Sequence, residues 1–582
     1  MPRLLMLLAL IATPLPGYTE DEVAFRAMAD EMERNFEQLR LGEEPAPYFI
    51  EYRMEDSYRL RVKAVLGAAT SDSVSRSRRG SAQVRVGSHE LDSSLVQRFN
   101  QRGSTMHRYY DPRGFTLPVD QDYAGIRRAF WVATDLAYKR ALEDFAVKQA
   151  DADRVLDRDG MPDFWKVEPA EMMEDISAEP VDEAAVRSLV GELSRVFEGI
   201  PEIHESAAWG SVGFRVVRQL NSEGTRVRRT VSEVTLGMIV RTQADDGAVL
   251  WDFELYKVPG WSQLPSATEL KRAAHALARR LIDARKAQRL DQYIGPVLFQ
   301  GQAAAVLFAN QFATQLMSVP RMVAAEPAVR RWVTDLQERE QRFGRKIGAR
   351  VLPRGSTLVD DPTLKEFAGL PLGGSFSVDD EGVPGRPKVL VEDGRLQQIL
   401  STRVPMYGTT GSTGNNRGGF PMPSNLILTS QQPANPKELR AKFEELRVDA
   451  ATDFVIEIEK MAVNEVRQAL ESMQSMPAFS YGDRLPQALV AWKVYPDGSR
   501  VRIRNLNIEP FAVREFRRLE AVGDDPYVHT TTPPFPSGGT FLSGVRGRME
   551  PASFVVPSLL FEELAVGDSK AMDRRPPVLS RP

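Results

Sequence analysis

Cysteine is absent from the 582 residues of the sequence. The chain can therefore hold no disulfide, no thiolate metal ligand and no cysteine nucleophile. Histidine is scarce as well: there are five, and no two of them stand at the short spacing that would place both imidazoles on one helix face. A metal site would therefore need ligands from distant parts of the chain.

A large excess of one charge and long apolar runs are missing too. The net charge is −4, and arginine and lysine form no long basic stripe, so we expect no nucleic-acid partner. Beyond the N-terminus there is no uninterrupted apolar run of the length that spans a bilayer, so we expect no membrane span in the mature chain. Hydrophobic residues make up 42% and charged residues 26%, as in globular proteins, and the length predicts at least two domains.

The two ends differ from the rest of the chain. A short positive start, an apolar run over residues 4–12 and a helix-breaking stretch after it predict a signal peptide over residues 1–18. We therefore expect a secreted or periplasmic protein, the alternative being a buried or lipid-associated N-terminal helix. Residues 571–582 are rich in proline and arginine and are predicted to be a disordered tail.

The predicted fold class is α+β. Residues 19–290 are expected to form an N-terminal domain in which helices pack on an antiparallel sheet, and residues 291–570 a C-terminal domain of mostly antiparallel β structure. The helices of the first domain are predicted over residues 19–41, 120–150, 184–197 and 267–286. Its strands are predicted over 48–68 with a break near 55–57, and over 83–86, 213–220, 226–241 and 249–256. In the second domain we expect hairpins over 388–400 and 487–508 and a helix over 436–446.

One long apolar helix is predicted over residues 301–317, and amide side chains interrupt it at Asn310, Gln311 and Gln315. Positions 311 and 315 share a helix face, whereas 310 and 315 are about 140° apart on an ideal helix. Two groups at that second spacing could meet only if the helix widened locally. By themselves these residues are typical of a core helix whose amides bond to one another or to the backbone.

Short segments around this helix follow one another in a distinctive order and spacing. They lie at residues 83–92, 221–225, 295–299, 303–305, 359–362, 378–382, 389–396, 413–417 and 423–425. Together they resemble the TldD/PmbA family of metallopeptidases, and the resemblance covers most of the chain between the predicted signal peptide and the tail. It implies a TldD/PmbA-like C-terminal domain that carries the 301–317 helix.

Catalytic members of this family carry a His-Glu-x-x-x-His motif on the corresponding helix and a C-terminal cysteine as third zinc ligand. The matching positions here are Asn310 and Gln315 for the histidines, Gln311 for the general base and Ser543 for the cysteine. Amide oxygens are weak zinc ligands, and Gln311 cannot take up a proton at neutral pH. The resemblance therefore implies the PmbA (TldE) branch, which lacks the zinc motif, and favours a non-enzymatic role without a cofactor.

The Gly-rich segment 407–420 lacks the Gly-Lys-Ser/Thr of a phosphate-binding loop, which argues against a nucleotide ligand. In the resembling family this region lines a peptide-binding cleft. The resemblance implies that a peptide or unfolded polypeptide segment contacts Thr413, Gly414, Asn415, Asn416 and Arg417. The alternative is a mobile surface loop. The resemblance also implies a homodimer, or a heterodimer with a TldD-like paralogue.

Three functions stay open at this point. The first is a peptide-binding or partner subunit without zinc, the second an active metal-dependent peptidase with a rearranged site, and the third a structural interaction protein. Acidic side chains could also gather around Ca²⁺ or Mg²⁺, although turns and helix caps account for them more simply. These are Asp360, Asp361, Asp379, Asp380 and Glu381.

Overall fold

The computed structural model describes residues 21–97, 114–150, 160–176, 179–320, 322–339, 342–463, 465–466, 485–533 and 550–568. The predicted signal peptide, Ser543 and the predicted tail lie outside these residues. The described part has a mixed α+β fold with several sheets, as predicted. None of its helices is both long and apolar enough to cross a membrane.

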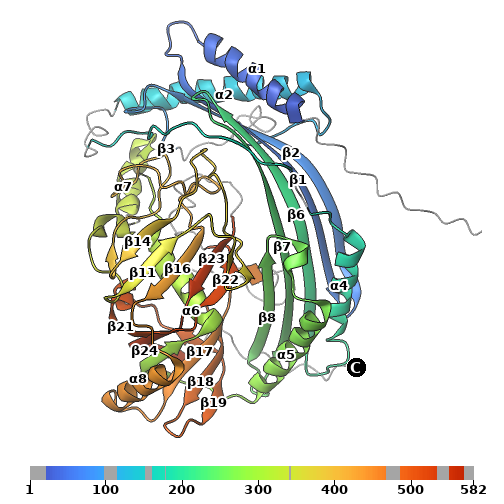
Figure 1. The fold of residues 1–582 in the computed structure, drawn as a ribbon, viewed down its shortest axis with the longest axis vertical. Helices are drawn as coiled ribbons and strands as arrows, with labels where there is room; N and C mark the ends of the chain where they lie inside the picture. Colours follow the sequence, from blue (N-terminus) through green and yellow to red (C-terminus); the bar gives the residue numbers. More distant parts are fainter. Residues whose placement is uncertain are drawn as a thin grey trace, which may run out of the picture.

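A curved sheet of very long strands dominates the first half of the chain (Figure 1). Its path is β4-β2-β1-β6-β7-β5, and β8 pairs with β7. The strands are β1 (Pro47–Val65), β2 (Ala68–Val86), β4 (Phe115–Thr116), β5 (Glu171–Met173), β6 (Glu205–Asn221), β7 (Arg226–Gln243) and β8 (Val249–Val258). The predicted meander of three strands is confirmed, and each strand is longer than predicted.

The predicted break in the first strand, near residues 55–57, is wrong. β1 runs without interruption, and Glu55 and Asp56 pair with β2 on one side and with β6 on the other. Arginines of the neighbouring strands neutralise the acids: Asp56 lies 2.5 Å from Arg78 and 2.6 Å from Arg218. The polar stretch is accommodated within the strand because its charges are paired across the sheet.

The hairpin between β1 and β2 turns at Leu66 and Gly67. Both have positive φ, 49° and 82°, as a two-residue turn that follows the strand twist requires. β2 then returns along the whole of β1, and the strand predicted at residues 83–86 is only its last part.

Helices cover the convex face of the long sheet, and the second half of the chain lies against the concave face (Figure 1). α4 (Glu183–Arg195) and α5 (Ala267–Arg285) pack against β1, β6, β7 and β8, while α1 (Asp21–Gln38) and α2 (Tyr123–Ala150) pack at the other end of the sheet. Side chains of β7 alternate accordingly. Met238 and Val240 lie in the core beneath α4 and α5, and Ile239 lies in the core of the second half. The sheet is therefore buried on both faces where the second half docks.

Two large sheets form most of the second half, with paths β15-β14-β11-β16-β23-β22 and β17-β9-β24-β20-β18-β19, and β21 pairs with β24. The strands of the first path are β11 (Ser356–Asp360), β14 (Lys388–Glu392), β15 (Arg395–Leu396), β16 (Asn425–Ser430), β22 (Tyr527–Thr531) and β23 (Ala552–Val556). Those of the second path are β9 (Gln292–Phe299), β17 (Val455–Met461), β18 (Ala488–Val494), β19 (Arg500–Ile503), β20 (Leu506–Ile508), β21 (Leu519–Val522) and β24 (Leu559–Asp568).

The predicted hairpins of this half and its helix after Asn435 are present. Both hairpins form, and the predicted helix is α8 (Pro436–Asp449), capped by the side chain of Asn435. Seven strands of these two sheets were not predicted, namely β9, β11, β16, β21, β22, β23 and β24. β23 is buried at every position, so its sequence shows no alternation of apolar and polar residues to mark a strand. The predicted domain boundary near residue 290 falls between α5 and β9.

Candidate functional site

The helix singled out by the sequence is irregular. α6 (Gly301–Leu307) is α-helical, residues Phe308–Phe312 form a π-helical turn, and Ala313–Leu316 form a 3₁₀ turn. In the π-turn the Ala313 N–H donates to the Phe308 carbonyl, five residues back instead of four. The prediction of one regular helix to residue 317 is therefore wrong. The π-turn widens the helix beside Asn310 and Gln315. Their side chains, five residues apart, could meet only if the helix widened in this way.

α6 is held between the two sheets of the second half. It packs against β17 on one side and against β22 and β23 on the other. Gln302 anchors its start, because its amide donates to the Met461 carbonyl at 3.0 Å and accepts from the Met461 N–H at 2.8 Å. In the sequence, Ser543 belongs to the connection between β22 and β23. The helix thus lies beside both strands that flank this predicted site residue.

An aromatic cluster packs on the buried side of the π-turn. Phe308 and Phe312 stack with their ring centroids 4.8 Å apart. Phe312 also meets Phe343 at 5.3 Å and Phe516 at 5.4 Å, both edge-on. All four rings are buried, so this side of the turn is closed to water.

Asn310, Gln311 and Gln315 are the only residues from 303 to 320 that keep some solvent exposure. The Asn310 Nδ2 donates to the Val306 carbonyl at 2.8 Å. Within the described part of the chain, the side chains of Gln311 and Gln315 make no hydrogen bond. The positions singled out by the sequence are therefore the accessible ones, and two of their amides are free.

Three amides do not fit a zinc ion. Zinc is held in proteins by thiolate, neutral imidazole or carboxylate ligands, and these positions supply none of them. The Asn310 amide is also engaged with the backbone of its own helix. No three side chains of histidine, aspartate or glutamate come together in a metal-binding group anywhere in the described ranges.

The loop predicted to contact a peptide uses most of its polar groups within the fold. Asn415 is fully buried; its Nδ2 donates to Asp360 at 2.9 Å, and its Oδ1 accepts from Lys388 at 2.9 Å. Arg417, also buried, donates to the Pro423 carbonyl at 2.8 Å.

The other three members of the loop are held as well. The Asn416 N–H donates to Asp379 at 2.9 Å, and the positive φ of Gly414, 68°, shapes the turn. Only Thr413 keeps a partly exposed side chain. The predicted peptide contact stays a prediction. In this conformation the exposed parts of the loop are Thr413 and the neighbouring Gly418 and Gly419.

A short segment connects the helix to this loop. The Leu400 N–H donates to the Leu316 carbonyl at 3.1 Å, at the end of the 3₁₀ turn. The next residue bonds to the loop: the Ser401 N–H donates to the Thr413 Oγ1 at 2.7 Å, and the Thr413 N–H donates to the Ser401 Oγ at 3.0 Å. The structure therefore brings together the two predicted parts of the site, which are far apart in the sequence.

An acidic turn at residues 379–381 anchors the loop to the concave face of the long sheet. Asp380 forms ion pairs with Arg53 of β1, at 2.6 Å, and with Arg229 of β7, and it accepts from the Gly418 N–H at 2.7 Å. Burial opposes its ionisation, but the two arginines outweigh burial and hold the pKa of Asp380 below its usual range. This acid therefore ties the two halves of the chain together instead of binding a cation.

Three other carboxyls meet at the same interface. Burial, and then the charge of Glu381, raises the pKa of Glu51 to about 7 and that of Asp379 to about 8. Burial also raises the pKa of Glu381. Carboxyl groups in this cluster therefore retain protons near neutral pH. Glu51 was not singled out by the sequence, since a glutamate within a long strand carries no signal of this environment.

A buried histidine lies on β22, beside α6. Burial lowers the pKa of His529 to about 4, so its imidazole is neutral. The neighbouring Glu465 accepts from the Thr532 N–H at 2.6 Å and from Thr531 at 2.7 Å. The Nε2 of His529 and the Oε2 of Glu465 are buried without a hydrogen-bond partner among the described residues. The sequence did not single out His529, because a lone histidine in a strand carries no signal of such an environment.

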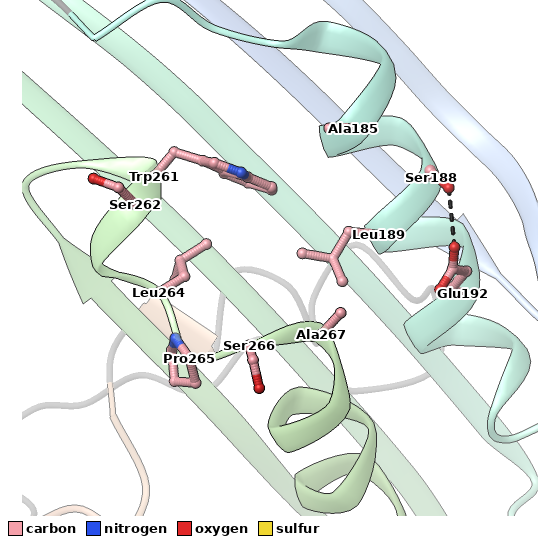
Figure 2. Close-up of a pocket in the computed structure, with 10 residues that line it drawn as sticks. All are labelled: Ala185, Ser188, Leu189, Glu192, Trp261, Ser262, Leu264, Pro265, Ser266 and Ala267. Atoms are coloured by element: carbon pink, nitrogen blue, oxygen red, sulfur yellow. Dashed lines mark hydrogen bonds between the residues drawn. The ribbon is translucent and has the colours of Figure 1, made fainter.

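A surface groove of about 420 Å³ lies apart from these residues, between α4 and the start of α5 (Figure 2). Leu189 of α4 points toward Leu264 and Ala267, and Trp261 closes one end. None of the predicted site residues lines this groove. It lies on the convex side of the long sheet, whereas the 301–317 helix lies in the half that covers the concave side.

Comparison with known proteins identifies the family. Residues 296–456 match the PmbA/TldA metallopeptidase C-terminal domain. These residues belong to the PmbA/TldD metallopeptidase family. The matched range contains both the 301–317 helix and the 413–417 loop, so the two parts of the candidate site lie in the segment that defines the family.

Relatives with known names match over parts of their length. A metalloprotease of Archaeoglobus fulgidus is 40% identical over 72 residues, which are 12% of this chain and 16% of that protein. A metalloprotease TldD homolog of Buchnera aphidicola is 25% identical over 227 residues, 39% of this chain and 41% of the homolog. The matches thus span less than half of the length of these relatives.

Solved structures share the fold over nearly the whole chain. A putative modulator of a DNA gyrase from Thermotoga maritima aligns with a TM-score of 0.58 over 94% of this chain and 100% of that one, at 14% identity. TldE from Thermococcus kodakarensis aligns with a TM-score of 0.55 over 93% of this chain and 100% of that one, also at 14% identity. At these identities the likeness concerns the fold alone.

Proposed function

We propose that this PmbA/TldD-family chain is a peptide-binding or partner subunit that works without zinc and without peptidase activity. The observation that carries the proposal is the chemistry of the three accessible positions of the 301–317 helix. Asn310, Gln311 and Gln315 replace two imidazoles and a carboxylate in the pattern of catalytic family members, and none of them fits zinc. A proton acceptor for a hydrolytic water is missing from the same positions.

Free amides suit another ligand. A primary amide offers one acceptor and two donor hydrogens, which matches the N–H and C=O groups of an extended peptide backbone. Gln311 and Gln315 both keep exposure and have unbonded side chains. We assign them the role of holding a peptide segment, with the exposed backbone of the 413–419 loop close to the same helix end.

Metal analysis tests the zinc-free part of the proposal. The full chain, incubated with zinc and dialysed, should retain far less than one zinc per chain. The variant Asn310→His/Gln311→Glu/Gln315→His/Ser543→Cys restores the family's ligand types and should gain about one zinc if these positions converge. Stoichiometric zinc in the unaltered chain that is lost in Gln315→Ala would contradict the proposal.

Peptide binding is tested with a fluorescein-labelled, unstructured 15-residue peptide by fluorescence anisotropy. We expect binding by the unaltered chain and about thirtyfold weaker binding by Gln311→Ala/Gln315→Ala, since two hydrogen bonds of about 1 kcal/mol each are lost. Gln432→Ala, at an exposed glutamine outside the site, is the matched control. Equal peptide affinity of all three proteins would show that the two glutamines do not contribute to peptide binding.

An active peptidase is the second candidate function, because the curated relatives are named metalloproteases. It predicts cleavage of unstructured peptides that stops when a chelator is added. Absence of cleavage with and without added zinc would exclude it.

We also propose that the subunit works as a dimer, either with itself or with a TldD-like paralogue, and that residues 1–18 direct its export from the cytoplasm. Intact mass measured on protein recovered from the expressing cells tests the export step. Loss of the first residues together with recovery outside the cytoplasm is expected, and retention of Met1 in an exported protein would contradict a cleaved signal peptide.

A further inference from the structure

The outer edge of β2 is open over a long stretch. Residues 68–77 are all exposed, and among the residues that the structure describes they pair with β1 alone. Within the described residues, the other edge of β2 is paired only at Arg79 and Gly80, by β4. Ten consecutive residues therefore present one row of strand N–H and C=O groups to solvent. In Figure 1 this strand forms the rim of the long sheet.

From Ser71 to Ser77 this edge lacks the devices that usually protect an exposed edge, and the register shift near the hairpin turn lies beyond that stretch, at residues 69–71. Residues 68–77 contain no proline, lysine or glycine, and one aspartate balances one arginine. The register with β1 runs without a bulge from Ser71 to Arg85. Serines occupy every second position from 71 to 77, so one face carries only small side chains that would not obstruct an added strand. An edge of this length and regularity is a template for another strand.

The remaining side chains of the edge are self-complementary. Asp72, Val74 and Arg76 share the face on which α4 packs, since Asp72 pairs with Arg187 of α4 and Arg76 lies over the Tyr58 ring. If two copies of the edge pair antiparallel about a two-fold axis at Val74, Asp72 faces Arg76 of the partner subunit. The second Asp–Arg pair forms by symmetry, and Val74, 44% exposed in one chain, is covered by its symmetry mate.

We propose that the β2 edge, defined as residues 68–77, is the surface through which two copies of this chain associate, in antiparallel register centred on Val74. A two-fold axis at Ser73 would place Asp72 opposite Val74 of the partner subunit and leave the charges unpaired. The assembly joins the two long sheets into one continuous sheet. This inference concerns the partner surface and does not depend on zinc content or on peptide binding.

The absence of cysteine from the chain allows a direct test by disulfide trapping. In the proposed register the two Val74 residues are directly opposite, with Cα atoms about 4.5–5.5 Å apart, which is within reach of a disulfide. Under mild oxidation the single variant Val74→Cys should become mostly a covalent dimer on a non-reducing gel. Thr70→Cys is the matched control on the same strand. Its two copies would be eight residues out of register, about 27 Å apart, and should stay monomeric.

Charge reversal gives an independent measurement. Arg76→Asp places aspartates opposite each other at both symmetric positions, so the dimer dissociation constant, measured by light scattering over a dilution series, should rise about tenfold or more. Arg128→Asp makes the same change at an exposed position of α2 and should leave the constant unchanged. Equal melting temperatures would show that the variants fold. The proposal is overturned if Val74→Cys crosslinks no faster than Thr70→Cys, or if Arg76→Asp dimerises as tightly as the unaltered chain.

Discussion

Replacing Glu51 with glutamine should stabilise the protein at alkaline pH and leave it nearly unchanged at acid pH. Glu51 lies on β1 at the interface with the second half of the chain, where its Oε2 accepts from the Gln219 Nε2 at 3.0 Å. A glutamine has the same size and can still accept this bond through its amide oxygen. The substitution therefore removes the titrating charge and preserves the packing.

The direction follows from the raised pKa. Glu51 has a pKa of about 7 in the folded chain against an ordinary value of 4.5, so between these values the folded state binds more protons than the unfolded state. The free energy of unfolding therefore falls as pH rises from about 4.5 to about 7, and the full cost is present above pH 7. A shift of this size corresponds to at most about 3 kcal/mol. Below pH 4.5 the carboxyl is protonated in both states and the cost disappears.

Urea unfolding followed by tryptophan fluorescence at pH 4.5, 6, 7 and 8 measures this dependence. The difference between Glu51→Gln and the unaltered chain should grow with pH and level off above pH 7. Glu55→Gln is the matched control on the same strand: it breaks the pair with Arg215, at 3.2 Å, and should not stabilise at any of these pH values. A difference that stays flat from pH 4.5 to 8 would refute the argument that Glu51 holds a proton at this interface.

Further substitutions test the packing around the site. Asp380→Asn removes the charge that faces two largely buried arginines and should lower the free energy of unfolding by about 3–5 kcal/mol, measured with urea; a change below 1 kcal/mol would show that the ion pairs are not needed. Phe312→Ala opens the aromatic cluster beside the π-turn and should cost about 3–5 kcal/mol in the same assay, and an unchanged unfolding midpoint would contradict this packing. Gln302→Ala removes both hydrogen bonds to the backbone of Met461, so hydrogen exchange at the Met461 amide should become faster. The free energy of unfolding should fall by about 1–3 kcal/mol. Unchanged exchange would mean that these bonds do not protect the strand end.

Local signals in the sequence predicted much of the fold. Turns and caps depend on residues a few positions apart, which is why the meander of the long sheet and the helix after Asn435 were predicted close to their true places. The continuity of β1 could not be predicted in the same way. Its acidic middle is acceptable only because Arg78 and Arg218 arrive from two other strands.

The candidate site shows the same division. The three amide positions and the 413–417 loop were identified from sequence and from the family resemblance, and the structure links them through Leu400 and Ser401. Sequence reasoning did not anticipate that Asn415 and Arg417 would be buried and bonded to the chain's own groups. Whether a polar side chain faces a ligand or the protein's own backbone depends on the residues that pack around it. The local sequence does not determine which of the two occurs.

The sequence by itself determined the composition of the site: no cysteine, no paired histidines, and amides at positions 310, 311 and 315. These are chemical facts that no folding can alter. The tertiary structure decided that these amides are the exposed positions of a buried segment and that the helix widens into a π-turn beside them. It also decided that, among the described residues, one edge of β2 stays unpaired over residues 68–77. The exposure of the amides, the widening of the helix and the pairing of the β2 edge each depend on contacts between residues far apart in the chain. These contacts form only when the chain folds.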